Sequence, residues 1–153
     1  ARPPLDTAYR EHKTALKKEH AKRIRAQSGR ITGSIDIDST LASTRANQQL
    51  HRWDYGLGYC LTAKEDEYAI WIEVHSAETS EVKVVENKLD QLKKYLQTSA
   101  PALYDLTQKN KDPATRYIWI ASGRINIPRH TRQARRLDQH PELSFPVKHL
   151  VLP

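Results

Sequence analysis

Cysteine is almost absent from this sequence, because Cys60 is the only one in 153 residues. A single cysteine excludes an intrachain disulfide and a zinc site built from several thiolates. The seven histidines offer no substitute, since none stands in the His-X-X-X-His spacing typical of zinc ligands on a helix. We expect Cys60 to be a small buried residue of a strand in a reducing environment.

Long apolar runs are also missing from the chain. No stretch approaches the roughly 20 residues that a membrane-spanning helix needs, and no signal-peptide pattern is visible. Hydrophobic residues make up 38% of the sequence and charged residues 28%. This balance and length predict one globular domain spanning 1–153, located in the cytoplasm and not associated with a membrane.

The net charge of +7 is distributed unevenly along the sequence. Residues 1–30 hold nine Lys/Arg against three acids, and residues 122–153 hold six against two. Between them, residues 31–121 hold ten Lys/Arg against thirteen acids. Two basic ends around an acidic middle suggest a phosphate-binding rim around a metal-binding centre, so nucleic acid is the expected partner. Solvated helical surfaces at the two ends are the alternative interpretation.

Hydrophobic periodicity and turn residues predict the order of elements. A basic helix is expected from Asp6 or Thr7 to about Gln27, and an amphipathic helix starts at Thr79 or Ser80 and carries apolar residues to Leu96. Polar connections are expected at 39–50 and 105–115. The predicted strands are 31–38, 55–63, 68–77, 116–122 and 147–152, and a short basic helix covers 131–139.

This order predicts an α/β fold with a mixed central sheet flanked by helices. Three consecutive strands form a meander, and a helix then crosses over to a fourth buried strand, giving α-β-β-β-α-β. The core covers about 5–122, and residues 123–153 form a basic C-terminal extension.

Two acidic residues stand out in the middle of the chain. Asp54 lies at the head of one predicted strand, and Glu73 interrupts the apolar run of the next. A carboxylate there is costly without a partner, and two carboxylates beside strand ends can hold a hard divalent cation. Gly56 and Gly58 share the strand face of Asp54, which indicates the close approach of another group.

The element order and these acidic positions together resemble the PD-(D/E)XK nuclease superfamily. In the resemblance, Asp54 and Glu73 are the metal ligands for Mg²⁺ or Mn²⁺. The catalytic lysine expected two residues after Glu73 is replaced by His75, so Lys88 or Lys83 on the following helix is the candidate substitute. Gln91-Leu92-Lys93-Lys94-Tyr95 matches a Gln-hydrophobic-X-X-Tyr pattern of the RecB-like branch.

The same branch has a Gly-X-X-Asp pattern, which Gly33-Ser34-Ile35-Asp36 matches, so Asp36 is a rival to Asp54. We prefer Asp54, because a single hairpin separates it from Glu73. The catalytic candidates are therefore Asp54, Glu73, His75, Lys88 and Gln91.

The resemblance implies an enzyme that hydrolyses phosphodiester bonds of DNA or RNA. A different class of function is open as well, because loss of the lysine favours a catalytically decayed module that binds nucleic acid or another protein. A site serving something other than nucleic acid is a third possibility. The resemblance also leaves a homodimer open.

Overall fold

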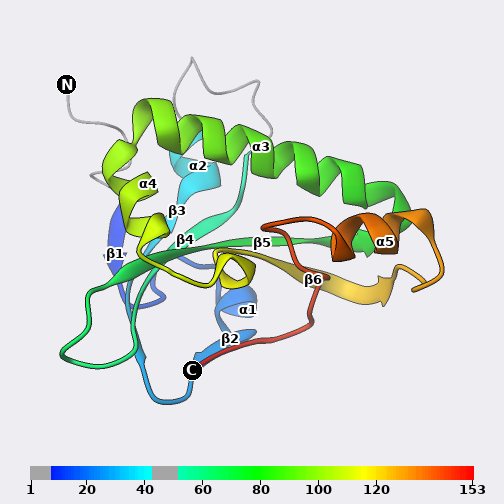
Figure 1. Ribbon diagram of the computed structural model, residues 1–153. Helices are drawn as coiled ribbons and strands as arrows, with labels where there is room; N and C mark the ends of the chain where they lie inside the picture. The colour runs from blue at the N-terminus through cyan, green and yellow to red at the C-terminus, as the bar shows by residue number, and fades with distance from the viewer. Residues whose placement is uncertain (1–7, 43–51) are drawn as a thin grey trace.

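The computed structural model of the protein describes residues 8–42 and 52–153. Its centre is a five-stranded mixed sheet in the order β1-β3-β4-β5-β6 (Figure 1). All neighbours are antiparallel except β5 and β6, which run parallel. The strands are β1 (Tyr9–Glu11), β3 (Arg30–Asp36), β4 (Tyr55–Cys60), β5 (Tyr68–Glu78) and β6 (Tyr117–Asn126). The predicted α/β class with a mixed sheet is confirmed.

Helices and a small second sheet cover the two faces of the central sheet. The long helix α3 (Val82–Ser99) lies along one face with α4 (Pro101–Gln108), and the short α1 (Lys18–Ala21) lies on the other (Figure 1). A parallel pair, β2 (Ile24–Ala26) with β7 (Leu150–Leu152), accompanies α1. The remaining elements are α2 (Ile37–Ala42), η3 (Thr79–Glu81), η4 (Pro113–Thr115) and α5 (Arg132–Asp138).

Each face of the sheet has its own hydrophobic core. The α3 face buries all three tryptophans, Trp53, Trp71 and Trp119, against the apolar stripe of that helix. The α1 face buries Tyr55, Tyr59 and the aliphatic residues of β5 and β6. Residues of β5 alternate between the two clusters, so this strand is central and covered on both sides, as its apolar run predicts. The helix predicted from Thr79 or Ser80 is confirmed by α3, whose buried residues include Val82, Val85, Leu89, Leu92 and Leu96.

The prediction of a long N-terminal helix is wrong. Residues 9–26 instead form β1, the four-residue α1 and β2, and the predicted cap at Asp6 or Thr7 lies outside the described residues. The apolar stripe of this segment was thin. Its few large apolar residues pack separately onto the sheet, with Leu16 and Ile24 buried in the α1-face core. Pairing of β1 with β3 and of β2 with β7 overrides the helical pattern.

Several boundaries also differ from the prediction: β4 ends at Cys60 rather than at 63, β6 continues to Asn126 rather than ending at 122, and β7 begins at Leu150 rather than at 147. The strand expected over 31–38 ends at Asp36, because Asp36 caps the start of α2. The loop expected over 105–115 instead contains the end of α4 and the turn η4. Pro101 therefore begins a helix, since proline fits the first helical turn. Of the polar connection predicted over 39–50, residues 43–50 lie outside the described residues.

Residues after β6 return to the sheet. The Val147 amide donates to the Trp119 carbonyl at 3.0 Å, and the Ala121 amide donates to the Val147 carbonyl at 2.8 Å. Further along, β7 pairs with β2. The expected C-terminal extension thus covers the outer edge of β6 and joins β7 to β2.

Gly56 makes room for a core tryptophan. A Cβ added at Gly56 would lie 2.6 Å from Cζ3 of Trp71, the residue paired with it across the β4–β5 ladder. The space that the strand glycines clear is therefore filled at this position by the protein's own aromatic ring.

We predict that Gly56→Ala lowers the free energy of unfolding by about 1–3 kcal/mol, because Trp71 must shift in a packed core. Gly123 provides a matched control, since a Cβ there meets nothing within 4 Å. Gly123→Ala should change stability by no more than about 1 kcal/mol. Urea denaturation of both variants measures the difference, and equal effects would contradict the packing argument.

Candidate functional site

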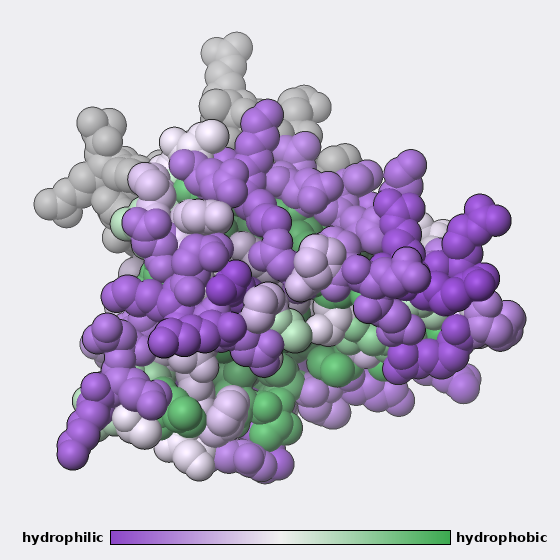
Figure 2. All heavy atoms as spheres, viewed as in Figure 1, coloured by the Kyte–Doolittle hydropathy of each residue, from purple (hydrophilic) through white to green (hydrophobic). Residues whose placement is uncertain are grey.

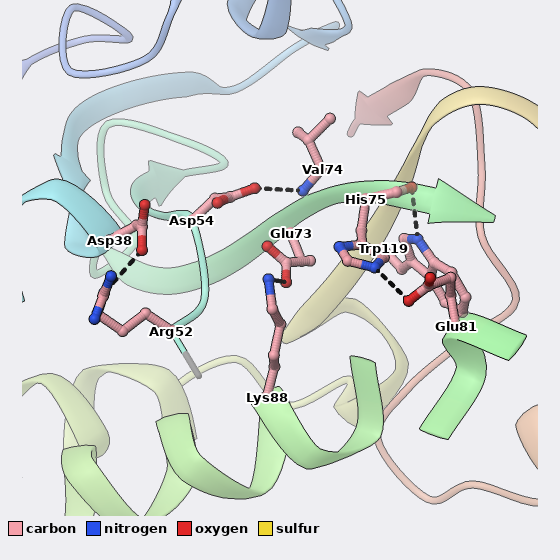
Figure 3. Close-up of polar contacts among 9 residues, drawn as sticks. All are labelled: Asp38, Arg52, Asp54, Glu73, Val74, His75, Glu81, Lys88 and Trp119. Atoms are coloured by element: carbon pink, nitrogen blue, oxygen red, sulfur yellow. Dashed lines mark hydrogen bonds and ion pairs between the residues drawn. The ribbon is translucent and has the colours of Figure 1, made fainter. Parts of the chain in front are cut away.

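Asp54 and Glu73 meet at the place where β4 begins. Tyr55 pairs with Ile72 in the antiparallel ladder, so Asp54 and Glu73 occupy the next opposed positions. Tyr55 and Ile72 point into the α1-face core, and alternation therefore directs Asp54 and Glu73 toward α3. Oδ2 of Asp54 accepts a hydrogen bond from the Val74 amide at 2.9 Å (Figure 3). The side chain of Asp54 thus accepts the hydrogen bond of a β5 amide at the point where the backbone pairing of β4 with β5 stops.

Lys88 reaches Glu73 from α3. Its Nζ lies 2.8 Å from Oε2 of Glu73, and the two side chains point toward each other in Figure 3. The Glu73 side chain is fully buried, whereas 18% of the Lys88 side chain is exposed. Neither carboxyl oxygen of Glu73 takes part in a well-directed hydrogen bond with a described residue. Glu73 therefore contacts the Lys88 ammonium but lacks a complete hydrogen-bond shell.

The environment makes Glu73 a weak acid. Burial, followed by the negative charge of Asp54, raises its pKa from an ordinary value of 4.5 to about 9 against the opposing effect of the Lys88 ammonium. Without another cation, a proton on Glu73 relieves the cost of a buried carboxylate next to the charge of the half-buried Asp54. A group that neutralises this pair would take the place of that proton.

His75 turns away from the carboxylate pair. Its Nε2 lies 2.9 Å from Oε2 of Glu81 at the start of the helical segment, and its backbone carbonyl accepts from Nε1 of Trp119 at 3.1 Å (Figure 3). The ring is thus engaged with Glu81 at the position where the resemblance expects the lysine. Sequence reasoning missed Glu81, because its only signal was an acid in the first turn of the predicted helix.

The two lysine candidates on α3 differ in position. Lys88 contacts Glu73, and Lys83 is exposed near the start of the helix. Gln91 is also exposed; it lines a small hollow with Arg52, Trp53 and Tyr95, among others, and has no polar contact with Asp54 or Glu73 among the described residues. The structure therefore brings Lys88, and not Gln91, to the carboxylates.

Asp36 lies on the opposite face from Glu73. It pairs with Tyr55 across the β3–β4 ladder and therefore shares the direction of that side chain. Its carboxylate accepts from the amide and hydroxyl of Ser39 at 2.9 and 3.0 Å, which is the geometry of a helix cap. Of the two rival aspartates, the structure brings Asp54 to Glu73.

Asp38 and Arg52 form a neighbouring ion pair. Nε of Arg52 lies 2.9 Å from Oδ1 of Asp38, close to Asp54 along the chain (Figure 3). The Asp54 carbonyl also accepts from the amides of Ile37 and Asp38 at 3.0 and 3.3 Å. The start of α2 and the start of β4 are therefore tied together beside the site. Sequence periodicity carries no signal for this contact.

The donor set suits a hard cation that keeps much of its water. Two carboxylates with oxygen donors fit Mg²⁺ or Mn²⁺, which proteins often bind through one or two carboxylates. Among residues 8–42 and 52–153 there is no group of three or more His, Cys, Asp or Glu side chains arranged to hold a metal. A zinc-type site made entirely of side chains therefore does not occur in this part of the chain.

Comparisons with protein-family models, curated proteins and solved structures found no match to this chain. In the described parts of the chain, no helix combines the length and apolar character needed to cross a membrane.

The raised pKa of Glu73 predicts that stability falls as the pH rises. Between pH 4.5 and about 9 the unfolded chain has lost a proton that the folded protein retains, so each pH unit disfavours folding by up to about 1.4 kcal/mol. In Glu73→Gln this pH-dependent fall in the free energy of unfolding should disappear, because the amide does not titrate. Urea denaturation in EDTA at several pH values measures the slope, and identical slopes in both proteins would contradict the assignment.

Proposed function

We propose that this protein is a metal-dependent phosphodiesterase that acts on nucleic acid. The observation that supports it best is the buried Glu73 beside the half-buried Asp54, with Nζ of Lys88 at 2.8 Å from Glu73. The arrangement combines two hard oxygen ligands with a fixed ammonium, which is the donor set that phosphodiester hydrolysis requires. The proposal keeps the resemblance to the PD-(D/E)XK superfamily and moves the lysine from the strand to the helix.

In the proposed site, Asp54 and Glu73 hold Mg²⁺ or Mn²⁺. When bound, the cation supplies Lewis acidity and lowers the pKa of a coordinated water. Asp54 is already oriented by the Val74 amide, so its second oxygen is directed by the fold rather than by a mobile rotamer. Glu73 is fixed by the packing around it and by the charge of Lys88.

Lys88 supplies the positive charge that His75 does not. An ammonium beside the metal ligands stabilises negative charge on a phosphate under attack. His75 has a structural role in this arrangement, since its ring pairs with Glu81 and its carbonyl accepts from Nε1 of Trp119. The imidazole is thereby kept away from Glu73.

The proposed activity predicts cleavage of DNA or RNA that depends on Mg²⁺ or Mn²⁺. Asp54→Asn and Glu73→Gln should abolish it, because each removes a metal ligand. Lys88→Met should lower the rate by about 100-fold or more, as expected for loss of a transition-state charge. Fluorescent single- and double-stranded substrates, separated on a denaturing gel, report the cleavage.

Two variants serve as matched controls for that assay. Lys83→Met removes an exposed lysine from the same helix and should leave the rate unchanged. Asp36→Asn should also retain activity, because asparagine preserves the helix cap and the residue faces away from Glu73. Residual cleavage that is equal in the wild type and in Glu73→Gln would reveal a contaminating nuclease and sink the proposal.

A catalytically decayed module that binds nucleic acid is the second candidate. It is favoured by the complete burial of Glu73 under Lys88, since the ammonium occupies the side from which a cation would approach. In that case Lys88 is a structural counter-ion, and the protein would bind nucleic acid without cleaving it. Salt-dependent binding by both the wild type and Glu73→Gln, with no cleavage by either, is the expected result for this candidate.

A further inference from the structure

Part of the basic C-terminal segment meets the basic N-terminal segment in the folded protein. β2 runs parallel to β7, and the Leu150 amide donates to the Arg23 carbonyl at 2.7 Å. Lys148 is thereby placed next to the segment that carries α1 and β2. The arginines of α5 lie elsewhere, since Arg136 pairs with Glu86 of α3.

This surface adjoins the end of β4 where the carboxylate pair lies. Nδ1 of His20 in α1 lies 2.7 Å from the hydroxyl of Tyr55, and the Lys17 amide also reaches that hydroxyl, at 3.5 Å. Tyr55 directly follows Asp54 and points to the opposite face of the sheet. Figure 1 shows α1 on one side of the sheet and α3 on the other. The carboxylates and Lys88 therefore lie on the α3 face of the sheet, and the basic α1 segment lies on the opposite face, near the same end of β4.

Not every basic residue of this region is available for a ligand. Nζ of Lys13 donates to the carbonyls of Ala21 and Ile24 at 3.0 and 2.8 Å. The guanidinium of Arg23 donates to the carbonyls of Ala121 and Ser122, which ties α1 to β6. These two cations hold the segment in place and have structural roles.

A second group of cations is exposed and has no such role. Within residues 8–42 and 52–153, the side chains of these cations form no hydrogen bond or ion pair. Glu19 is the one acidic residue of α1 itself. We call these residues the end patch: Lys17, Lys18, Lys22, Arg25 and Lys148. The apolar side chains exposed beside it are Val147 at 37% and Val151 at 43%, so cations outnumber apolar groups on this surface.

We propose that the end patch binds the phosphate backbone of the nucleic acid. This inference rests on the proposed function, because it names the surface that would hold the substrate. Flexible, exposed lysines suit phosphates, whose contacts depend on charge rather than on base sequence. Since the patch draws on both ends of the chain, only the folded protein presents it.

Binding measured in the Glu73→Gln background tests the patch without cleavage. Fluorescein-labelled DNA and RNA oligonucleotides of about 20 nucleotides, single- and double-stranded, are titrated in EDTA over about 50–300 mM salt. Replacing Lys17, Lys18 and Lys22 with Ala should weaken binding by about tenfold or more and lower the salt slope by about two to three. The matched control replaces Lys64, Lys109 and Lys111 with Ala, which removes the same charge at the far end of β4 and should leave binding close to normal.

Each outcome of this experiment separates the patch from the catalytic proposal. Recovery of binding when the three α1 lysines are Arg supports a charge contact, and circular dichroism confirms that each variant is folded. Equal loss in the patch and control variants overturns the proposal, because net charge alone then explains binding. Patch-dependent binding of polyglutamate, with no patch-dependent binding of nucleic acid, also overturns it in favour of an acidic protein. If the patch governs binding while no protein cleaves, the surface stands and the phosphodiesterase fails.

Discussion

The contact between Lys88 and the buried Glu73 is the interaction on which the site depends. A carboxyl group with no exposed surface is tolerated only because an ammonium lies 2.8 Å away and because burial favours its protonated form. Removing one partner of such a pair leaves an uncompensated polar group in the core. The pair also links the middle of α3 to the centre of β5. The position of the helix on the sheet therefore determines the geometry of the site.

The strand order explains why this contact lies where it does. β4 begins at Tyr55 while β5 continues to Glu78, so β5 loses its antiparallel neighbour just beyond Glu73. The side chain of Asp54 satisfies the Val74 amide at that step. The end of β4 pairing thus places Asp54 beside Glu73, and the Val74 amide of β5 keeps a hydrogen-bond acceptor. The polar surface over α3 in Figure 2 lies outside this buried arrangement.

The origin of the positive charge distinguishes this chain from the pattern that it resembles. A lysine two residues after Glu73 would share its strand face, but His75 stands there and is drawn to Glu81. A helix that crosses over the same strand can deliver an ammonium to the same carboxylate, because only the position of the charge matters for electrostatic stabilisation. The proposed chemistry therefore depends on the packing of α3 more than on any local motif of β5.

Local patterns determined much of this protein. The alternation in β3 and β4, the apolar run of β5 and β6, and the 3-4 spacing of α3 predicted the mixed sheet and its main helix, because each buries one face or both. The same patterns indicated Asp54 and Glu73, since a carboxylate in an apolar strand is anomalous. They failed for residues 9–26, where strand pairing overrides a weak helical stripe. Only the tertiary structure selected Lys88 over Lys83, separated Asp36 from Asp54 by sheet face, and placed Lys148 beside the basic N-terminal segment. These outcomes depend on which distant residues meet, and such meetings are set by packing and strand register rather than by neighbours along the chain.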